Sequence, residues 1–160
     1  MNAGTPGSAV AAARDAASCV FCAQQEEGAV WWRDAWLRVI EARDEPDYPG
    51  FCRLVWNAHV TEFSELSDGE RAHLMRALAA LERALRATLN PDKINIASLG
   101  NMVAHQHWHV IPRFADDPHF PAPVWAARRR EPCARQHAAR VAAAAGVGAA
   151  VRDALQRELG

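Results

Sequence analysis

The chain has 160 residues, of which 50% are hydrophobic and 23% are charged, with 18 basic and 19 acidic side chains. This length and balance are typical of a single soluble domain with its own core. The formal net charge of -1 gives no support for bulk electrostatic binding to nucleic acid or to an anionic membrane. No apolar run approaches the roughly 20 residues of a membrane span. We therefore expect a cytoplasmic protein that binds neither nucleic acid nor membrane.

The first 18 residues contain neither the basic start nor the leucine-rich core of a secretory signal. They are rich in alanine, glycine and serine, which do not predict a packed element. We interpret residues 1–18 as a flexible N-terminal arm.

Two of the four cysteines, Cys19 and Cys22, form a C-x-x-C pair directly after this arm. In an intracellular protein this spacing occurs in metal sites and in redox pairs. The flanking residues lack the buried strand and the helix that a thioredoxin-type pair requires. Half of a metal site is therefore favoured, followed by structural thiols and then by a redox pair. Cys52 and Cys133 have no evident partner, and we expect both to be buried as small hydrophobic residues.

The first half of the chain predicts strands and one long helix. Residues 29–41 are expected to form two short strands around a turn at Arg33 and Asp34, and residues 51–56 a third strand. The helix is expected over residues 68–89, because Ser67 and a glutamate three positions later form a capping box. Its leucines recur at spacings of three and four, which predicts a buried stripe. The stripe consists of Leu74, Leu78, Leu81, Leu85 and Leu89.

Two further strands are expected after the helix, over residues 93–99 and 105–111, and Pro112 is expected to end the second. Residues 115–123 contain three prolines and predict an irregular segment. Residues 126–160 are rich in alanine and arginine, and we expect them to form a C-terminal helical extension.

His105, His107 and His109 occupy every second position of the last predicted strand. Because successive strand residues point to opposite faces, all three imidazoles are expected on the same face. A lone histidine in a strand is usually a core or surface residue. Three in register concentrate groups with reference pKa values near ~6.5 in one patch, which indicates chemistry rather than packing.

Such a triad could hold a catalytic metal or contain a nucleophilic imidazole. His105 and His109 are separated by ~13 Å along an extended strand at ~3.3 Å per residue. That separation is awkward for a single shared ion. The spacing therefore favours a central nucleophile, His107, between two supporting groups.

The segment HQHWHVIPR at 105–113 resembles the motif of the histidine-triad (HIT) family of nucleotide hydrolases and transferases. Segment 93–109 is most similar to the bacterial branch that resembles diadenosine polyphosphate hydrolases. The upstream features that support the resemblance are CVFC at 19–22, Asp44 with its following Pro-Gly turn, His59, and the capped helix. The resemblance implies a HIT-like catalytic domain over residues 19–125. It implies an α+β fold, in which an antiparallel sheet of about five strands packs against the long helix.

The resemblance also implies an activity, namely hydrolysis or nucleotidyl transfer on dinucleoside polyphosphates or nucleoside phosphoramidates. In the family the middle histidine forms a covalent nucleotidyl intermediate, and that position is His107 here. His109 would contact the phosphate oxygens, and His105 would orient the nucleophile or bind metal. No cofactor is required for this catalysis. The substrate-binding residues implied are Asn95, Gly100 and Asn101.

Zinc-bearing members of the family imply a structural zinc and its ligands. Those ligands are Cys19, Cys22, His59 and His105, a closed tetrahedral set of two thiolates and two imidazoles. The alternative is that His59 simply ends its strand near Glu62. Family members are usually two-fold dimers, so we expect a homodimer.

Three features depart from the family pattern. Phe51 stands where members often have a histidine behind the triad, which leaves open which group aligns His107. Met102 stands where a hydroxyl residue commonly contacts phosphate, and the loop before the triad is short. Two other function classes stay open: a metal-dependent hydrolase that uses the three histidines as ligands, and a nucleotide-binding module with little turnover, which Phe51 and Met102 make plausible.

Overall fold

The structure is a computed structural model that describes residues 16–25 and 28–160. The predicted arm over residues 1–18 lies largely outside the described residues, and its last part, Ala16–Ser18, is a single 3-10 turn, η1. The strands are β1 (Val30–Arg33), β2 (Leu37–Glu41), β3 (Cys52–Trp56), β4 (Lys93–Ala97) and β5 (His107–Arg113). The remaining helices are η2 (Phe63–Glu65), α2 (Asp68–Leu89), α3 (Ala134–Ala144) and α4 (Val147–Leu159).

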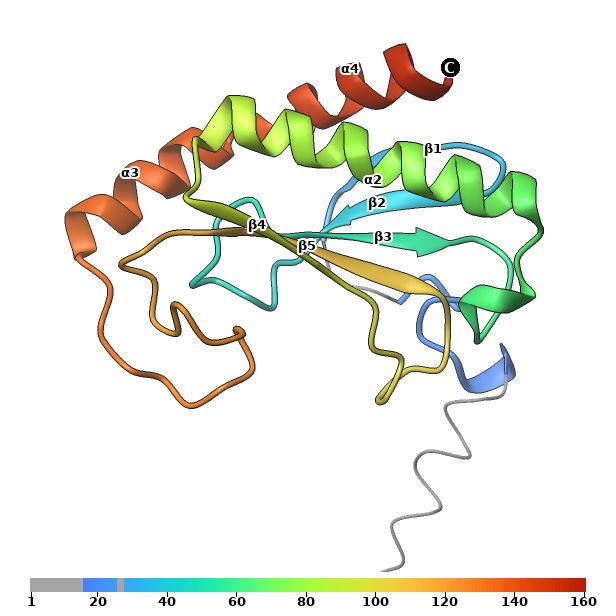
Figure 1. The fold of residues 1–160 in the computed structure, drawn as a ribbon, viewed down its shortest axis with the longest axis horizontal. Helices are drawn as coiled ribbons and strands as arrows, with labels where there is room; N and C mark the ends of the chain where they lie inside the picture. The colour runs from blue at the N-terminus through green and yellow to red at the C-terminus, as the bar shows by residue number, and fades with distance from the viewer. Residues whose placement is uncertain (1–15, 26–27) are drawn as a thin grey trace, which may run out of the picture.

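The five strands form one antiparallel sheet in the order β1-β2-β3-β5-β4 (Figure 1). Strand β5, which contains most of the histidine motif, lies between β3 and β4. The two strands predicted around Arg33 and Asp34 are β1 and β2, although a bulge between Val30 and Trp32 breaks the expected alternation. The predicted α+β fold with about five strands is confirmed.

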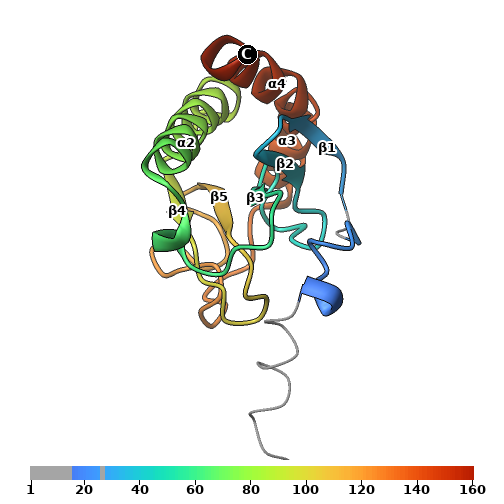
Figure 2. The same ribbon diagram turned by 90° about the vertical axis from the view of Figure 1, so that its right-hand side faces the viewer.

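Helices α2 and α4 cover one face of the sheet, and the loops gather on the other face (Figures 1 and 2). Alternation along β3 and β5 directs Leu54 and Val110 to the helix face, where both join the main core. Arg53 and His109, which are partners across the same two strands, face the loops. One face of the sheet therefore builds the core, and the other is left for a site.

Helix α2 has the bounds that its capping signals predict. The Ser67 hydroxyl accepts a hydrogen bond from the Glu70 backbone N–H, and the Glu70 carboxylate accepts one from the Ser67 backbone N–H. At the other end Asn90 adopts a left-handed conformation, with φ 46°, and closes the helix. All five leucines of the stripe are buried, so the helix contributes the largest apolar face of the core.

The prediction that Pro112 ends the last strand is wrong. Pro112 lies inside β5 and pairs with Ile94 of β4. The pairing of β5 with β3 stops at Val110, so beyond that residue β5 has a neighbour on one side only. A proline is tolerated there because its missing N–H removes no bond to a second neighbour.

The C-terminal helical extension begins at Ala134 rather than at residue 126, since residues 126–133 form a loop. Helix α4 buries Val147, Val151 and Leu155 in the main core beside α2. Gly148 allows its close approach to the sheet, because a Cβ there would lie 2.9 Å from the Trp31 ring. In the described part of the chain no helix combines the length and apolar character needed to cross a membrane.

The two isolated cysteines differ in environment. Cys52 is buried in the main core, as predicted. Cys133 was also expected to be buried, but it is exposed. The reason is that it forms the N-cap of α3, a helix with no buried residue. Cys133 therefore offers a surface thiol for comparison with the C-x-x-C pair.

Candidate functional site

A pocket of about 630 Å³ opens on the loop face of the sheet, above β3 and β5. Its walls come from residues 16–25, called here the N-terminal segment, from the loop that precedes β5 and from the loop that follows it. The lining residues are Val20, Phe21, Gln25, Asp44, Arg53, Leu99, Gly100, Asn101, Met102, Val103, His107, His109 and Trp125. Two of the three triad histidines thus share a cavity large enough for a small ligand.

The main chain fixes the tautomer of His107. Its Nδ1 atom lies 2.7 Å from the carbonyl oxygen of His105, and because a carbonyl only accepts, Nδ1 donates this bond. Burial lowers the pKa of His107, and the positive charge of Arg53 lowers it further. The neutral ring therefore keeps its lone pair on Nε2. An imidazole in this state can act as a nucleophile.

His109 lies in an aromatic environment. Ring centroids of His107, Trp125 and Phe51 are 5.0, 5.1 and 5.8 Å from its own. Burial, followed by the neighbouring His107 and Arg53, lowers the pKa of His109 to about 4. At neutral pH His109 therefore carries no positive charge.

Phe51, the first departure from the family pattern, lies beside His109 of the triad. Phe51 packs against the ring of His109, whereas His107 is oriented by the carbonyl of His105. With Phe51 in place of a histidine, the group that orients His107 is therefore the main-chain carbonyl of His105. Met102, the second departure, lies at the mouth of the pocket with 86% of its surface exposed.

The expected substrate-binding residues separate into two groups. Gly100 and Asn101 line the pocket, and Gly100 adopts a positive φ of 69° that favours glycine. Asn95 is outside the pocket lining, because its Oδ1 accepts a hydrogen bond from Nη1 of Arg113 at 2.7 Å. The structure thus assigns Asn95 a contact with a buried arginine instead of a contact with the cavity.

An ion pair in the pocket wall was not predicted. The two terminal nitrogens of Arg53 donate to the two carboxylate oxygens of Asp44, each at 2.8 Å. This bond is the main cause that lowers the pKa of Asp44. Asp44 belongs to the features that support the family resemblance, whereas Arg53 is indicated only by being an arginine within the otherwise apolar strand FCRLVW.

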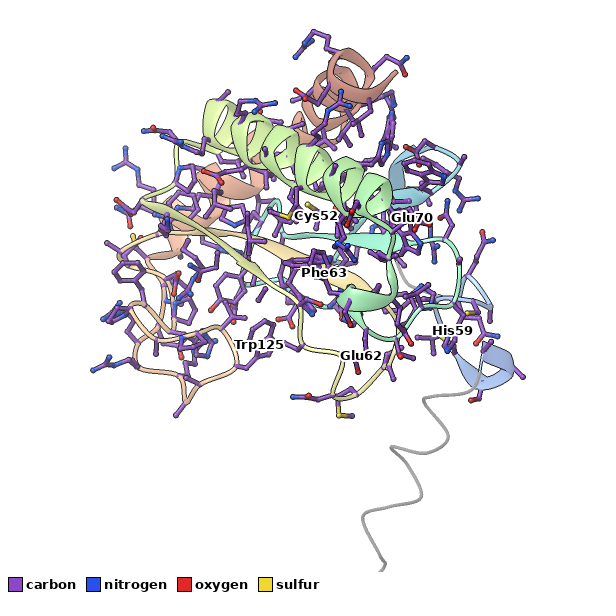
Figure 3. The ribbon with its side chains drawn as sticks, turned by 45° about the vertical axis from the view of Figure 1, so that its right-hand side comes forward. Cys52, His59, Glu62, Phe63, Glu70 and Trp125 are labelled. Carbon is purple, nitrogen blue, oxygen red and sulfur yellow. The ribbon has the colours of Figure 1, made fainter. Side chains whose placement is uncertain are left out.

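Trp125 is another pocket residue that the sequence did not indicate, and it comes from the loop after β5 (Figure 3). A buried ion pair organises that loop: Arg113 Nε lies 2.7 Å from Asp117 Oδ2, and both residues are 2% exposed. Asp117 also accepts hydrogen bonds from the backbone N–H groups of His119 and Phe120. No local sequence pattern predicts where such a loop places a tryptophan.

A second cluster lies beside the pocket, toward the N-terminal segment. It consists of Cys19, Cys22, His59 and His105, whose candidate ligand atoms all lie within 4.8 Å of one another. The Cys22 Sγ atom is 3.2 Å from Nδ1 of His59, and the Cys19 Sγ atom is 3.4 Å from Nδ1 of His105. Figure 3 shows His59 on this side of the molecule, close to the first described residues.

His105 joins the cluster to the pocket. Its Nε2 lies 2.6 Å from the carbonyl oxygen of Trp56 and donates to it, so the unprotonated Nδ1 faces the thiols. A metal-binding histidine is commonly oriented by such a bond from its other ring nitrogen. The carbonyl of the same residue accepts the bond from His107. The residues present therefore fit a tetrahedral metal with two sulfur and two nitrogen ligands.

Comparison with known proteins agrees with this geometry. The model of the HIT domain family matches residues 33–116. An uncharacterised HIT-like protein of Saccharolobus solfataricus is 28% identical over 109 residues, which cover 62% of this chain and 77% of that protein.

Solved structures extend the likeness to the fold. A histidine triad protein of Bradyrhizobium japonicum is 26% identical, with a TM-score of 0.63 over 86% of this chain and 95% of its own. A zinc-bound histidine triad family protein of Mycobacterium smegmatis shares the fold with a TM-score of 0.53 and 23% identity, over 85% of this chain and 99% of its own. The matched family model includes β2, β3, α2 and the whole histidine motif. This chain belongs to the HIT domain family.

Proposed function

We propose that the protein is a nucleotide hydrolase or nucleotidyl transferase whose nucleophile is His107. Membership of the HIT family supports a nucleotide-directed function in general. The observation that supports the finer assignment is the bond from His107 Nδ1 to the His105 carbonyl, which leaves Nε2 unprotonated beside a pocket. We propose dinucleoside polyphosphates or nucleoside phosphoramidates as the substrates.

The chemistry proceeds in two displacements at one phosphorus atom. In the first, the Nε2 lone pair of His107 attacks the α-phosphorus, a P–N bond forms, and the bond to the leaving group breaks. In the second, water attacks the same phosphorus, the P–N bond breaks, and a nucleoside monophosphate and the free imidazole are released. Fixed donors in the wall stabilise the negative charge that develops on the phosphoryl oxygens. His109 and Asn101 line the same cavity and can donate to these oxygens.

The alternative of a metal-dependent hydrolase requires all three histidines to bind one ion. Among the described residues, the ligand atoms that converge include those of His105 but not those of His107 or His109. The nucleophile is therefore the better supported of the two functions. A nucleotide-binding module with little turnover is distinguished by the following test.

The covalent intermediate is the direct test of this proposal. We expect brief incubation with diadenosine tetraphosphate or adenosine phosphoramidate, then denaturation at alkaline pH, to leave one adenylyl group on the protein. Peptide mass spectrometry should locate it on His107. Binding of nucleotide with neither adduct nor product would identify a binding module instead. Product release without an adduct would contradict the two-step mechanism.

We further propose that Cys19, Cys22, His59 and His105 hold a structural zinc ion. The convergence of their ligand atoms supports this, as does the tautomer of His105. That a solved relative of the same fold is zinc-bound agrees with the proposal. When bound, the ion would tie the N-terminal segment to the start of the histidine motif. We also propose that the protein is cytoplasmic and that it forms a two-fold homodimer.

Metal content should depend on the C-x-x-C pair and not on other thiols. We expect about one zinc per chain in the purified protein, because closed sets of this type bind zinc tightly. Cys22→Ser should remove most of it and lower the melting temperature. Cys133→Ser is the matched control, since that thiol is exposed and outside the cluster. Elemental analysis of the three proteins gives the result, and equal zinc in all of them would rule out this ligand set.

A further inference from the structure

We propose that Arg53 binds the phosphate group of the nucleotide and is a further substrate-binding residue of the pocket. This inference rests on the proposed function, because it adds a residue to the same site. In the register of the sheet, Arg53 of β3 is the direct partner of His109 in β5. Side chains at such positions share a face, with Cβ atoms ~5 Å apart.

Arg53 supplies the positive charge that the pocket otherwise lacks. Among the described lining residues it is the single arginine or lysine, and Asp44 is the single carboxylate. His109 does not compensate, because Phe51 and Trp125 pack against its ring and burial keeps it neutral at pH 7. Without Arg53 the wall would present the negative charge of Asp44 to an incoming phosphate, which would repel it.

The guanidinium is also held in a fixed orientation. Asp44 accepts one hydrogen bond from each terminal nitrogen of Arg53, and the Phe51 ring lies 5.4 Å from the guanidinium carbon. A guanidinium has five N–H donors, so three are left after Asp44 has taken two. The side chain is 14% exposed, which leaves it shielded from bulk water but open to the cavity. A pre-oriented arginine of this kind is well suited to an oxyanion.

The ion pair could instead be a purely structural part of the wall, and the two roles predict different binding. A phosphate contact matters only to ligands that contain phosphate, whereas a structural pair affects every ligand in the pocket. The relevant quantity is therefore the ratio of the affinities for adenosine 5′-monophosphate and for adenosine.

Calorimetric titration with these two probes tests the proposal. We expect Arg53→Gln to reduce the preference for the monophosphate by about tenfold or more, because a bond to a charged group is lost. Adenosine affinity should stay within about twofold, and Arg53→Lys should retain part of the preference. Asp44→Asn should keep or increase it, since it removes a negative charge but leaves the guanidinium. Arg43→Gln, which alters an exposed arginine outside the pocket lining, is the matched control.

Two outcomes would overturn the assignment. One is an unchanged ratio in Arg53→Gln, including the case in which both ligands lose affinity equally there and in Asp44→Asn, as a structural pair would give. The other is wild-type protein that binds neither probe. The adenylyl adduct on His107 is measured separately. An adduct with an unchanged ratio would support the proposed function and contradict only the phosphate contact of Arg53. A reduced ratio with no adduct would support the phosphate contact and contradict the proposed function.

Discussion

His107→Asn is expected to lower kcat for diadenosine tetraphosphate or an adenosine phosphoramidate by at least about 10³-fold, because no covalent intermediate can form without the imidazole. Asparagine is close in size to the ring and can still donate to the His105 carbonyl. We therefore expect the variant to fold and to bind nucleotide. The measurement is product formation by chromatography, with circular dichroism to verify the fold.

His137→Asn serves as the control, because it makes the same substitution on α3, outside the pocket lining. It should leave kcat unchanged. Turnover that survives EDTA but disappears in His107→Asn would establish catalysis without a catalytic metal. Turnover that persists in His107→Asn but is abolished by EDTA would indicate a metal-dependent reaction and contradict the assignment of His107 as the nucleophile.

Asp117→Ala is expected to destabilise the protein by about 3–5 kcal/mol, the usual cost of leaving one member of a buried ion pair without its partner. Nε and Nη2 of Arg113 donate to the Asp117 carboxylate at 2.7 and 3.0 Å, and neither residue is more than 2% exposed. The substitution also removes the acceptor for two backbone N–H groups in the loop that bears Trp125. Urea unfolding followed by circular dichroism measures the change.

The exposed ion pair between Arg128 and Glu131 provides the comparison, because the Glu131 side chain is 83% exposed. Glu131→Ala should change the free energy of unfolding by less than about 1 kcal/mol, as for most surface pairs. Replacing both buried partners, Arg113→Met with Asp117→Leu, should recover much of the loss, because no unpaired charge is then buried. A single Asp117→Ala as mild as Glu131→Ala would show that the buried pair does not hold the loop.

The parts of the fold that the sequence predicts well are those governed by local periodicity. Helix α2 follows from its leucine spacing and from the capping box of Ser67 and Glu70, and the structure has it at the predicted bounds. The histidines of β5 follow from the period of two, which directs His107 and His109 into one pocket. In both cases all the residues of the pattern belong to a single helix or strand.

Other features depend on strand pairing between distant segments or on the packing of an irregular loop, so periodic patterns do not predict them. Arg53 enters the site because β3 pairs with β5 in a particular register, and Trp125 because Asp117 folds a loop around Arg113. Asn95 is of a residue type that often binds substrate, but its side-chain oxygen accepts a hydrogen bond from Arg113. Arg53 and Asn95 are therefore placed by the pairing of strands that are distant in sequence, and Trp125 by the packing of an irregular loop.

The atom that orients His107 belongs to the main chain of position 105, whereas the atom that faces the thiols belongs to its side chain. The orientation of His107 and the contact with the thiols can therefore be lost separately during evolution. A homologue that lacks the cysteine pair can also replace the first histidine of the triad, because every amino acid retains the main-chain carbonyl. As the proposed nucleophile, the middle histidine has no such freedom. Divergence at position 105 is then expected to follow the fate of Cys19 and Cys22 and not that of catalysis.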